Sequence, residues 1–443
     1  MTSHQLQLLF VDLSLILLLA RGLGWLLARV GQPPVVGEVL AGVLLGPTLF
    51  HGVIAGTLFP DDVRIPLTGM ADVGVALFMF AVGLEIDTAS LRGRGRVTAV
   101  SALGSTAVPF LLGVVLALWL VHEHQPQEPM AFIVFIGLSV SVTAFPVLAR
   151  ILADRRLSET ALGGVALATA AVVDVGAWVA LAGVQAAVGG GGQHWRVALV
   201  LPYAVLLLLV VRPRLRRLLF HGGTAARPTA AVTAVVLIGA LLSATATEAM
   251  GMHFIFGAFL FGLVIPRQNA AGLREALLDH TGRITSLLLP VYFVVAGLEV
   301  DLSRLRGAEL LQLGAILLVA VAGKFGGTFV AARSQGLPAR PAAALGALMN
   351  TRGLTELVIL GIGLQMKLLN GTLYSLMVVM AVVTTAMTGP LLSRVYAKPV
   401  ELGRPGRSRE PDPAQASPAQ EPSWSRQRAH RRDGPVRSRK SRT

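Results

Sequence analysis

Long stretches of apolar residues follow one another along almost the whole chain, separated by short polar segments. We predict about thirteen of them, near residues 6–28, 33–50, 66–85, 97–121, 130–149, 160–187, 196–211, 228–248, 252–266, 284–300, 308–332, 341–365 and 370–394. Most contain about 20 residues, which is long enough to cross a hydrocarbon core of roughly 30 Å as a helix. The pattern predicts an all-α polytopic membrane protein.

The composition agrees with this class. Hydrophobic residues make up 54% of the 443-residue chain and charged residues only 14%, a balance that soluble proteins of this size do not have. The first apolar run, Leu6–Leu27, contains Asp12 and Arg21 and lacks a small-residue cleavage site, so we expect a retained span. The chain has no cysteine, which excludes disulfides, thiol catalysis and thiolate metal sites.

Basic side chains are unevenly distributed between the loops. The formal net charge is +14, and residues 398–443 contribute +7 of it, from 12 Lys/Arg minus 5 Asp/Glu. Between the predicted spans, arginines gather in the odd-numbered loops, which the positive-inside rule places in the cytoplasm. We therefore expect a cytoplasmic C-terminus, an outside N-terminus and an odd number of spans. Residues 397–443 are expected to be a disordered basic tail that either touches anionic lipid or only helps to set the topology.

Two segments of the chain repeat each other. VGLEIDTASLRG (82–93) and AGLEVDLSRLRG (296–307) share seven of twelve positions at an offset of 214 residues. A weaker similarity links the segments 34–47 and 253–266, where chance resemblance between Gly/Leu-rich helices is the alternative. Both pairs are seven spans apart, so the copies face opposite ways. Such inverted repeats, here roughly 6–187 and 228–394, are typical of secondary transporters.

Asp174 is the only charged residue between Glu159 and Arg196 and lies inside the sixth predicted span. A carboxylate at membrane depth is costly unless it faces protein, water or an ion. The same group can hold either a proton or a cation, which is the minimum chemistry of cation/proton exchange. The alternative is that Asp174 pairs with a basic residue and only fixes helix packing.

Two predicted spans carry signals of broken helices, seven spans apart. In SVSVTAFPVLAR (139–150), Pro146 removes a backbone donor and the hydroxyls of Ser141 and Thr143 precede it, although an ordinary kink is the alternative. In MNTRGLTEL (349–357), Gly353 lies among polar side chains at membrane depth, namely Asn350, Thr351, Arg352 and Glu356. Paired broken helices point to an ion site. Arg352 and Glu356 also have the spacing of a structural i,i+4 ion pair.

Lys324 is the only charged residue near the middle of the eleventh predicted span. We expect it to be a partner of Asp174 or of the opened backbone rather than to extend to the interface. His253 has no second His or Cys at ligand spacing, so no transition-metal site is predicted.

Six motifs resemble those of the monovalent cation:proton antiporter-2 family of bacterial sodium or potassium/proton exchangers. They are PPVVGEVLAGVLLGP (33–47), LFMFAVGLEID (77–87), SVTAFPVLARIL (141–152), VDVGAW (173–178), FGAFLFGLVIPR (256–267) and MNTRGLTEL (349–357). The resemblance covers roughly residues 6–394. It implies a thirteen-span antiporter domain (1–396) in which the fifth and twelfth spans unwind and cross. It also implies a homodimer in the bacterial inner membrane that works by an elevator-like motion, with no enzymatic activity and no cofactor.

The family pattern places the essential carboxylate at Asp174. Members usually carry a second acidic or amide residue immediately before it, but this chain has Val173 there. With one titrating carboxylate, cation-bound and proton-bound Asp174 carry the same charge, which implies electroneutral 1:1 exchange if Lys324 keeps its proton. Ser141 and Thr143 would add oxygen ligands for a monovalent cation. No nucleotide-binding regulatory domain and no nucleic-acid partner are expected.

Two other functions remain open at the level of the sequence. One is symport of an organic anion on a related fold, which would not change the pH inside vesicles. The other is a sensor or leak pathway in which Val173 marks lost coupling. The sequence leaves the choice between Na⁺ and K⁺ open, because selectivity depends on cavity size and ligand number.

Overall fold

Helices make up almost all of the protein in the computed structural model. The structure describes residues 2–49, 52–85, 95–158, 160–188, 199–221, 224–225, 229–266, 271–303 and 306–396. The expected tail, 397–443, lies outside the described residues. Two very short strands, β1 (Phe220–His221) and β2 (Thr224–Ala225), pair antiparallel in a loop between helices.

Nine segments of the described chain are long and apolar enough to cross a membrane as helices. A tenth is obtained if α16 (Ala339–Met349) and α17 (Leu354–Gln365), which meet at a bend of 42°, are taken as one span. Two shorter apolar helices, α2 (Pro34–Leu45) and α13 (Phe254–Val264), come in addition. The polytopic all-α class is thus confirmed, whereas the number thirteen stays a prediction.

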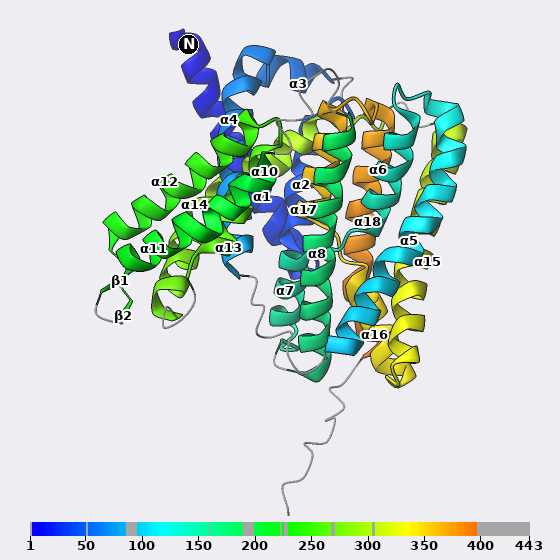
Figure 1. Ribbon diagram of the computed structural model, residues 1–443. Helices are drawn as coiled ribbons and strands as arrows, with labels where there is room; N and C mark the ends of the chain where they lie inside the picture. Colours follow the sequence, from blue (N-terminus) through cyan, green and yellow to red (C-terminus); the bar gives the residue numbers. More distant parts are fainter. Residues whose placement is uncertain are drawn as a thin grey trace, which may run out of the picture. The chain divides into compact units, whose positions relative to one another are not determined.

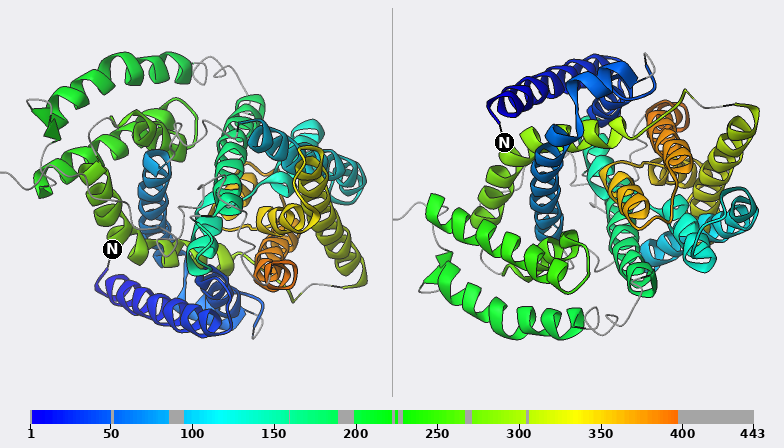
Figure 2. Two further views of the ribbon diagram at one scale, coloured as in Figure 1. Left: turned by 90° about the horizontal axis from the view of Figure 1, so that it is seen from below. Right: turned by 90° about the horizontal axis from the view of Figure 1, so that it is seen from above.

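One group of helices comes from both halves of the chain and packs together on one side of the molecule (Figures 1 and 2). We call it the first bundle. Its members are α1 (Ser3–Arg29), α2 (Pro34–Leu45), α4 (Asp61–Glu85), α10 (Val200–Leu206), the π-helix η2 (Leu207–Val211), α11 (Arg212–Leu219), α12 (Ala230–Ala249), α13 (Phe254–Val264) and α14 (Ala271–Leu298). The short α3 (Val53–Leu58) joins α2 to α4.

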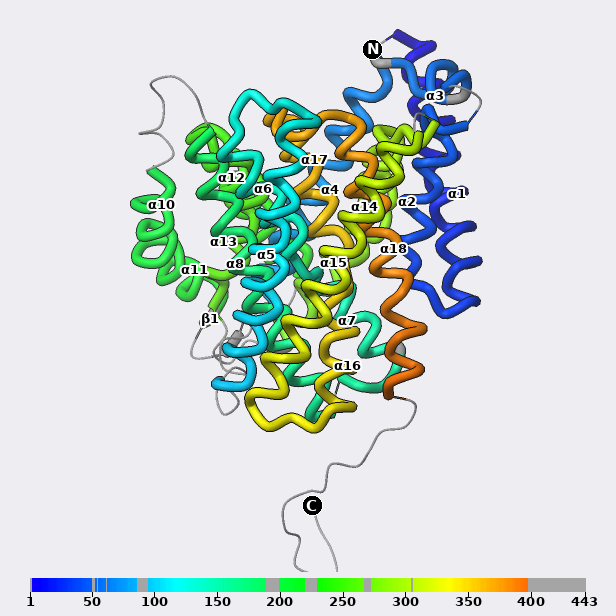
Figure 3. The backbone as a smooth tube through the Cα atoms, turned by 90° about the vertical axis from the view of Figure 1, so that its right-hand side faces the viewer, coloured from blue at the N-terminus to red at the C-terminus, as the bar shows by residue number. Residues whose placement is uncertain are grey.

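The remaining helices form the second bundle on the other side (Figure 2). They are α5 (Gly95–His124), α6 (Pro129–Ser141), α7 (Phe145–Asp154), α8 (Ala161–Val188), α15 (Gly307–Ser334), α16 (Ala339–Met349), α17 (Leu354–Gln365) and α18 (Gly371–Val395). The two bundles touch where α17 packs on α14 and α18 packs on α2. We call the side on which α1 begins the N face, and the side on which α18 ends the C face (Figure 3).

Glycines set two close helix crossings in the first bundle. A Cβ atom at Gly42 of α2 would lie 2.8 Å from the Cα of Gly297 on α14. A Cβ atom at Gly262 of α13 would lie 2.2 Å from the carbonyl oxygen of Phe80 on α4, beside Gly83. Real side chains do not tolerate such distances, so only glycine lets these backbones approach this closely.

The outer surfaces of both bundles expose large apolar side chains. On α5 these include Leu103, Leu111 and Val115, and on α10 Leu201, each more than 60% exposed. In lipid such residues are already in an apolar solvent, and the helices satisfy their own backbone groups. An outer surface of exposed apolar side chains is therefore typical of a helical protein embedded in a membrane.

Two helices of the second bundle are interrupted at mid-depth. α6 ends at Ser141 and α7 begins at Phe145, while α16 ends at Met349 and α17 begins at Leu354 (Figure 3). Pro146 lies at the start of α7, where its missing N–H costs nothing, so it begins a second half-helix rather than kinking a continuous one. The two breaks lie side by side, because the Ala144 N–H donates to the Thr351 carbonyl at 3.1 Å.

Candidate functional site

The carboxylate of Asp174 is buried on α8. This helix turns a stripe of small and apolar residues inwards at helical spacing, including Ala166, Ala170, Ala177 and Leu181. Asp174 lies on the same stripe and is 2% exposed. Its side chain has Thr355 of α17 as a hydrogen-bond partner, while its Oδ1 has none among the described residues. An unpaired buried carboxylate oxygen is costly, and a proton or a cation would satisfy it.

Lys324 reaches the site from α15 but does not pair with Asp174. Its side chain is fully buried, and its Nζ donates to the carbonyl oxygen of Ser105 at 2.8 Å and to that of Ser141. No ion pair between Lys324 and Asp174 occurs among the described residues, although the two are near enough to interact through space. Of the two partners expected for Lys324, Asp174 or opened backbone, the structure therefore shows a backbone contact at Ser141, while its role in the site stays a prediction.

Arg352 binds the same half-helix end. Its guanidinium donates to the carbonyl oxygen of Ser139 at 2.7 Å and to that of Val140, both at the end of α6. It also forms an ion pair with Glu356 at 2.7 Å, in which both side chains are fully buried. The C-terminal end of α6, where the helix dipole is negative, therefore binds two positively charged side chains.

The second break is held by hydroxyl groups of α18. Thr385 accepts a hydrogen bond from the Arg352 N–H at 3.0 Å and donates to the Arg352 carbonyl at 2.8 Å. Thr351 donates to Thr388, and Asn350 donates to the Thr384 carbonyl, both at 3.4 Å. Gly353 follows, where a Cβ atom would lie 2.4 Å from the Val147 side chain of the other break.

The predicted hydroxyl groups of the first break are both engaged as donors. Ser141 donates to the Leu138 carbonyl at 2.8 Å, and Thr143 donates to the Met349 carbonyl at 2.9 Å. Each oxygen keeps a lone pair that could face a cation. Val173, which precedes Asp174, is itself buried, at 3% exposure.

Sequence reasoning missed several residues of this cluster. Thr355 was part of the motif MNTRGLTEL, and its hydroxyl at membrane depth was the available signal. Ser105 contributes a backbone carbonyl, and Thr385 lies on a helix with no predicted role, so no side-chain pattern marked them. Among the described residues, no group of three His, Cys, Asp or Glu side chains could hold a metal ion.

These features define a class of protein. A buried carboxylate beside two adjacent helix breaks, in one of two bundles of membrane-spanning helices, is the architecture of an ion-coupled secondary transporter. The family model of the transmembrane sodium/hydrogen exchanger matches residues 14–398. The chain belongs to the sodium/hydrogen exchanger family, which confirms the family resemblance of its motifs. This is a family of transporters, not of enzymes.

Characterised relatives extend over the same region. The chain is 35% identical over 410 residues to the Na(+)/H(+) antiporter NhaS4 of Synechocystis, covering 90% of this chain and all of that protein. It is 37% identical over 410 residues to cation/H(+) antiporter 20 of Arabidopsis thaliana, covering 88% of this chain and 48% of the plant protein. The chain thus spans about half the length of the plant relatives it matches.

Another relative, the K(+)/H(+) antiporter 1 of Saccharomyces cerevisiae, is 34% identical over 413 residues, covering 89% of this chain and 47% of the yeast protein. Among solved structures, the sodium proton antiporter MjNhaP1 from Methanocaldococcus jannaschii matches with a TM-score of 0.63 at 14% identity. That match covers 89% of this chain and 97% of the other, and it confirms the antiporter fold.

Proposed function

We propose that this protein exchanges a monovalent cation, Na⁺ or K⁺, for protons by competition at Asp174. The observation that carries the proposal is the unpaired Oδ1 of Asp174, in a site where Lys324 donates to backbone carbonyls instead. The carboxylate is therefore available to either ion. The protein's membership of an exchanger family and its similarity to cation/H(+) antiporters agree with this chemistry.

The same contacts narrow the choice of cation ligands. The carbonyls of Ser139, Val140 and Ser141 already accept hydrogen bonds from Arg352 and Lys324, so these three carbonyl oxygens are not free to bind a transported cation. We infer that its ligands come from Asp174, the hydroxyl groups of Thr355, Thr143 and Ser141, and water. Hard oxygen donors of this kind suit Na⁺ or K⁺.

Charge counting supports a 1:1 exchange. The four buried charged side chains of this site, Asp174, Lys324, Arg352 and Glu356, sum to zero when all are ionised. Adding one cation or one proton at Asp174 gives +1 in both cases, so the loaded carrier has the same charge in both directions. The exchange is then electroneutral as long as Lys324 keeps its proton.

The two-bundle arrangement supports an elevator-like motion of the second bundle against the first. The inverted repeats belong to the same proposal: α2 of the first half crosses α14 of the second at Gly42 and Gly297, and α13 crosses α4 at Gly262 and Gly83. We further propose a homodimer in the bacterial inner membrane, with the N face outside and the C face cytoplasmic.

The test is exchange in proteoliposomes with a trapped pH dye, measured separately for Na⁺ and K⁺. Wild type is expected to alkalinise or acidify the lumen when a cation gradient is imposed, and Asp174→Asn to abolish the signal. Asp12→Asn is the matched control, because Asp12 is also fully buried and unpaired among the described residues but lies on α1 of the first bundle. This control should keep its activity.

Three results would contradict the proposal. Absence of exchange with either ion in well-folded protein would favour an organic-anion substrate or a sensor. Exchange that persists in Asp174→Asn would indicate a leak pathway or a different carrier residue. A sustained voltage generated by turnover would exclude the 1:1 stoichiometry.

A further inference from the structure

Two cavities lie between the bundles, one towards each face. The N-face cavity, of about 210 Å³, is lined by α4, α13, α14, α17 and α18. The C-face cavity, of about 260 Å³, is lined by α1, α2, α4 and α14 of the first bundle and by α7 and α17 of the second. Both reach α17 close to Thr355, the partner of Asp174: Val358 lines the first and Leu354 the second. They therefore approach the site from opposite sides.

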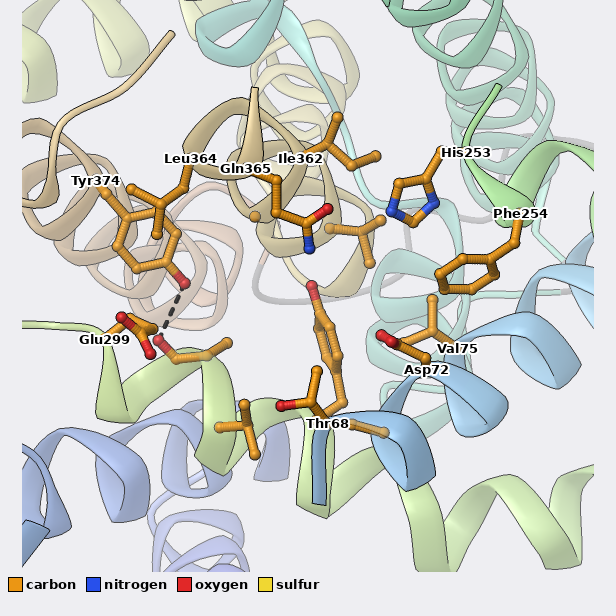
Figure 4. A pocket seen from close by; sticks show the side chains of 16 residues that line it. Thr68, Asp72, Val75, His253, Phe254, Glu299, Ile362, Leu364, Gln365 and Tyr374 are labelled. Atoms are coloured by element: carbon orange, nitrogen blue, oxygen red, sulfur yellow. Dashed lines mark hydrogen bonds between the residues drawn. The ribbon is translucent and has the colours of Figure 1, made fainter. Parts of the chain in front are cut away.

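The N-face cavity is acidic. Asp72 and Glu299 line it, and no Lys or Arg occurs among its described lining residues. Figure 4 shows Asp72, His253 and Gln365 around the same space, with Tyr374 donating to the Ala296 carbonyl at 3.0 Å. Glu299 has a partner at the rim, Arg64 at 4.0 Å, whereas Asp72 forms no ion pair within the part of the chain that the structure describes. The charge of Asp72 is thus not neutralised.

A second carboxylate adds to this charge. Asp72 also lines a lateral groove between α4 and α12, together with Glu248 and Thr245, and no basic residue lines that groove among the described residues. Glu248 is bonded to the Phe254 backbone N–H at 2.8 Å, which holds it near the entrance. Asp72 therefore lines two openings, the N-face cavity and the lateral groove, and acidic side chains line both of them.

The C-face cavity is basic by comparison. Arg21 and Arg150 line it, and Glu38 is the one acidic residue among its described lining residues. Arg21 donates to the Ser286 carbonyl at 2.7 Å and so stays at the wall. Three helices, α2, α7 and α17, begin at this cavity, and their N-terminal ends add positive partial charge. At the N-face cavity two helix N-terminal ends, of α13 and α18, are offset by the C-terminal ends of α14 and α17.

We propose that the two entrances treat cations unequally: the N-face cavity concentrates monovalent cations, the C-face cavity repels them, and Glu38 makes entry from the C face possible. This inference rests on the proposed exchange at Asp174. Asp72 and Glu38 act through the electrostatic potential in the cavities, since neither is in the site itself. The asymmetry concerns the apparent KM at each face. It does not change the equilibrium that the carrier reaches, because both directions share one cycle.

The size of the effect follows from the field in a low-dielectric cleft. One net charge about 10 Å from an entering cation changes its local concentration several-fold at an effective dielectric constant of roughly 20. We expect the KM for the cation to be about five- to tenfold lower at the N face than at the C face at low salt. The difference should shrink when salt shortens the Debye length from roughly 30 Å to roughly 8 Å.

The experiment compares right-side-out and everted membrane vesicles from a host without other exchangers. Cation-dependent proton movement is measured at about pH 8.5, where carboxylates are ionised, with and without impermeant choline chloride at roughly 150 mM. The chain contains no cysteine, so Ser286→Cys with an impermeant maleimide reports which preparation exposes the C face.

Variants that remove one charge should change the cation KM at one face only, in a direction set by the sign of the charge removed. Glu38→Gln should raise the KM about fivefold at the C face only, and Asp72→Asn should do the same at the N face only. Arg150→Gln should lower the KM at the C face, a change in the opposite direction that damage to the fold would not produce. The maximal rate should change less than twofold in each variant.

Equal KM values at both faces in active wild type would overturn the inference while leaving the proposed exchange intact. So would variants whose KM changes equally on both faces, or an unchanged C-face KM in Arg150→Gln. Absence of exchange in wild type would instead contradict the proposed function itself.

Discussion

The two helix breaks both lie in the second bundle but are stabilised in different ways. At the break between α6 and α7, the free carbonyls of Ser139, Val140 and Ser141 bind the charged side chains of Arg352 and Lys324. At the break between α16 and α17, neutral threonine hydroxyls of α18 bind the backbone, chiefly through Thr385. The first break depends on charges contributed by distant parts of the chain. The second break depends on hydroxyl groups of α18, the helix that follows it in the sequence.

Under the proposed exchange, this difference limits where a cation could bind. An unwound helix exposes carbonyls that would suit a cation, but at the first break positive side chains already bind them. The second break exposes no such row of free carbonyls, because the Arg352 carbonyl accepts from Thr385 and the Thr351 carbonyl accepts from Ala144. The unpaired carboxylate oxygen of Asp174 is therefore the best available acceptor for a cation in this region.

The largest effect is expected from removing the charge that joins the two breaks. Arg352→Gln would leave Glu356 as an uncompensated buried charge and two carbonyls unpaired, at a cost of about 3–5 kcal/mol in the free energy of unfolding. Thermal unfolding in detergent, followed by tryptophan fluorescence, should show a clearly lower midpoint. The double variant Arg352→Gln/Glu356→Gln should be less destabilised than Arg352→Gln by itself. Equal losses would mean that the ion pair is not what stabilises this break.

A smaller loss is expected at the other positive side chain. Lys324→Met keeps the length of the side chain but leaves the carbonyls of Ser105 and Ser141 without their donor, which should cost about 2–3 kcal/mol. Lys324→Arg can still donate and should recover part of the stability. The same unfolding assay measures both variants. If Lys324→Met were as stable as wild type, the first break would not depend on charge at this position.

The neutral break should be less sensitive. Thr385→Val removes one hydroxyl that both accepts from and donates to the Arg352 backbone, and we expect a loss of about 1–2 kcal/mol. Thr385→Ser keeps the hydroxyl and serves as the control. A loss as large as that of Arg352→Gln would remove the distinction between the two breaks.

The smallest effect is expected where one break touches the other. Thr143→Val removes a single hydrogen bond to the Met349 carbonyl, worth about 1 kcal/mol, whereas Thr143→Ser keeps it. The cation KM, measured in the same variants by the vesicle assay, separates two roles. A KM that rises in Thr143→Val and recovers in Thr143→Ser indicates that the hydroxyl oxygen is a cation ligand. Loss of stability without a change in KM indicates that the hydroxyl only holds the two breaks together through its hydrogen bond to Met349.

Much of this molecule could be predicted from its sequence. The polytopic helical class, the breaks at 142–144 and 350–353, the burial of Asp174 and the Arg352–Glu356 pair all follow from local pattern. Apolar length, a proline at the start of a half-helix and i,i+4 spacing are properties of short segments, and a membrane penalises any unsatisfied group within them. The family was recognisable for the same reason, because its motifs surround these local signals.

What the sequence could not provide was the partners that buried groups find on other helices. Lys324 was expected near Asp174 or near open backbone, and only packing placed its ammonium on the carbonyls of Ser105 and Ser141. Thr355 and Thr385 were not singled out, because a threonine in an apolar helix gives no indication of what it will face. Their roles depend on which helices pack together.

The sequence by itself determined the membrane class, the family, the presence of the two breaks and the buried carboxylate that we propose as the ion carrier. The tertiary structure decided which charges bind the broken helix, where the two bundles meet, and that the N-face cavity is lined by acids while the C-face cavity is lined by arginines and a single glutamate. The physical reason is range. Helix formation and membrane burial depend on neighbouring residues, whereas the potential in a cavity is the sum of charges from helices far apart in the chain.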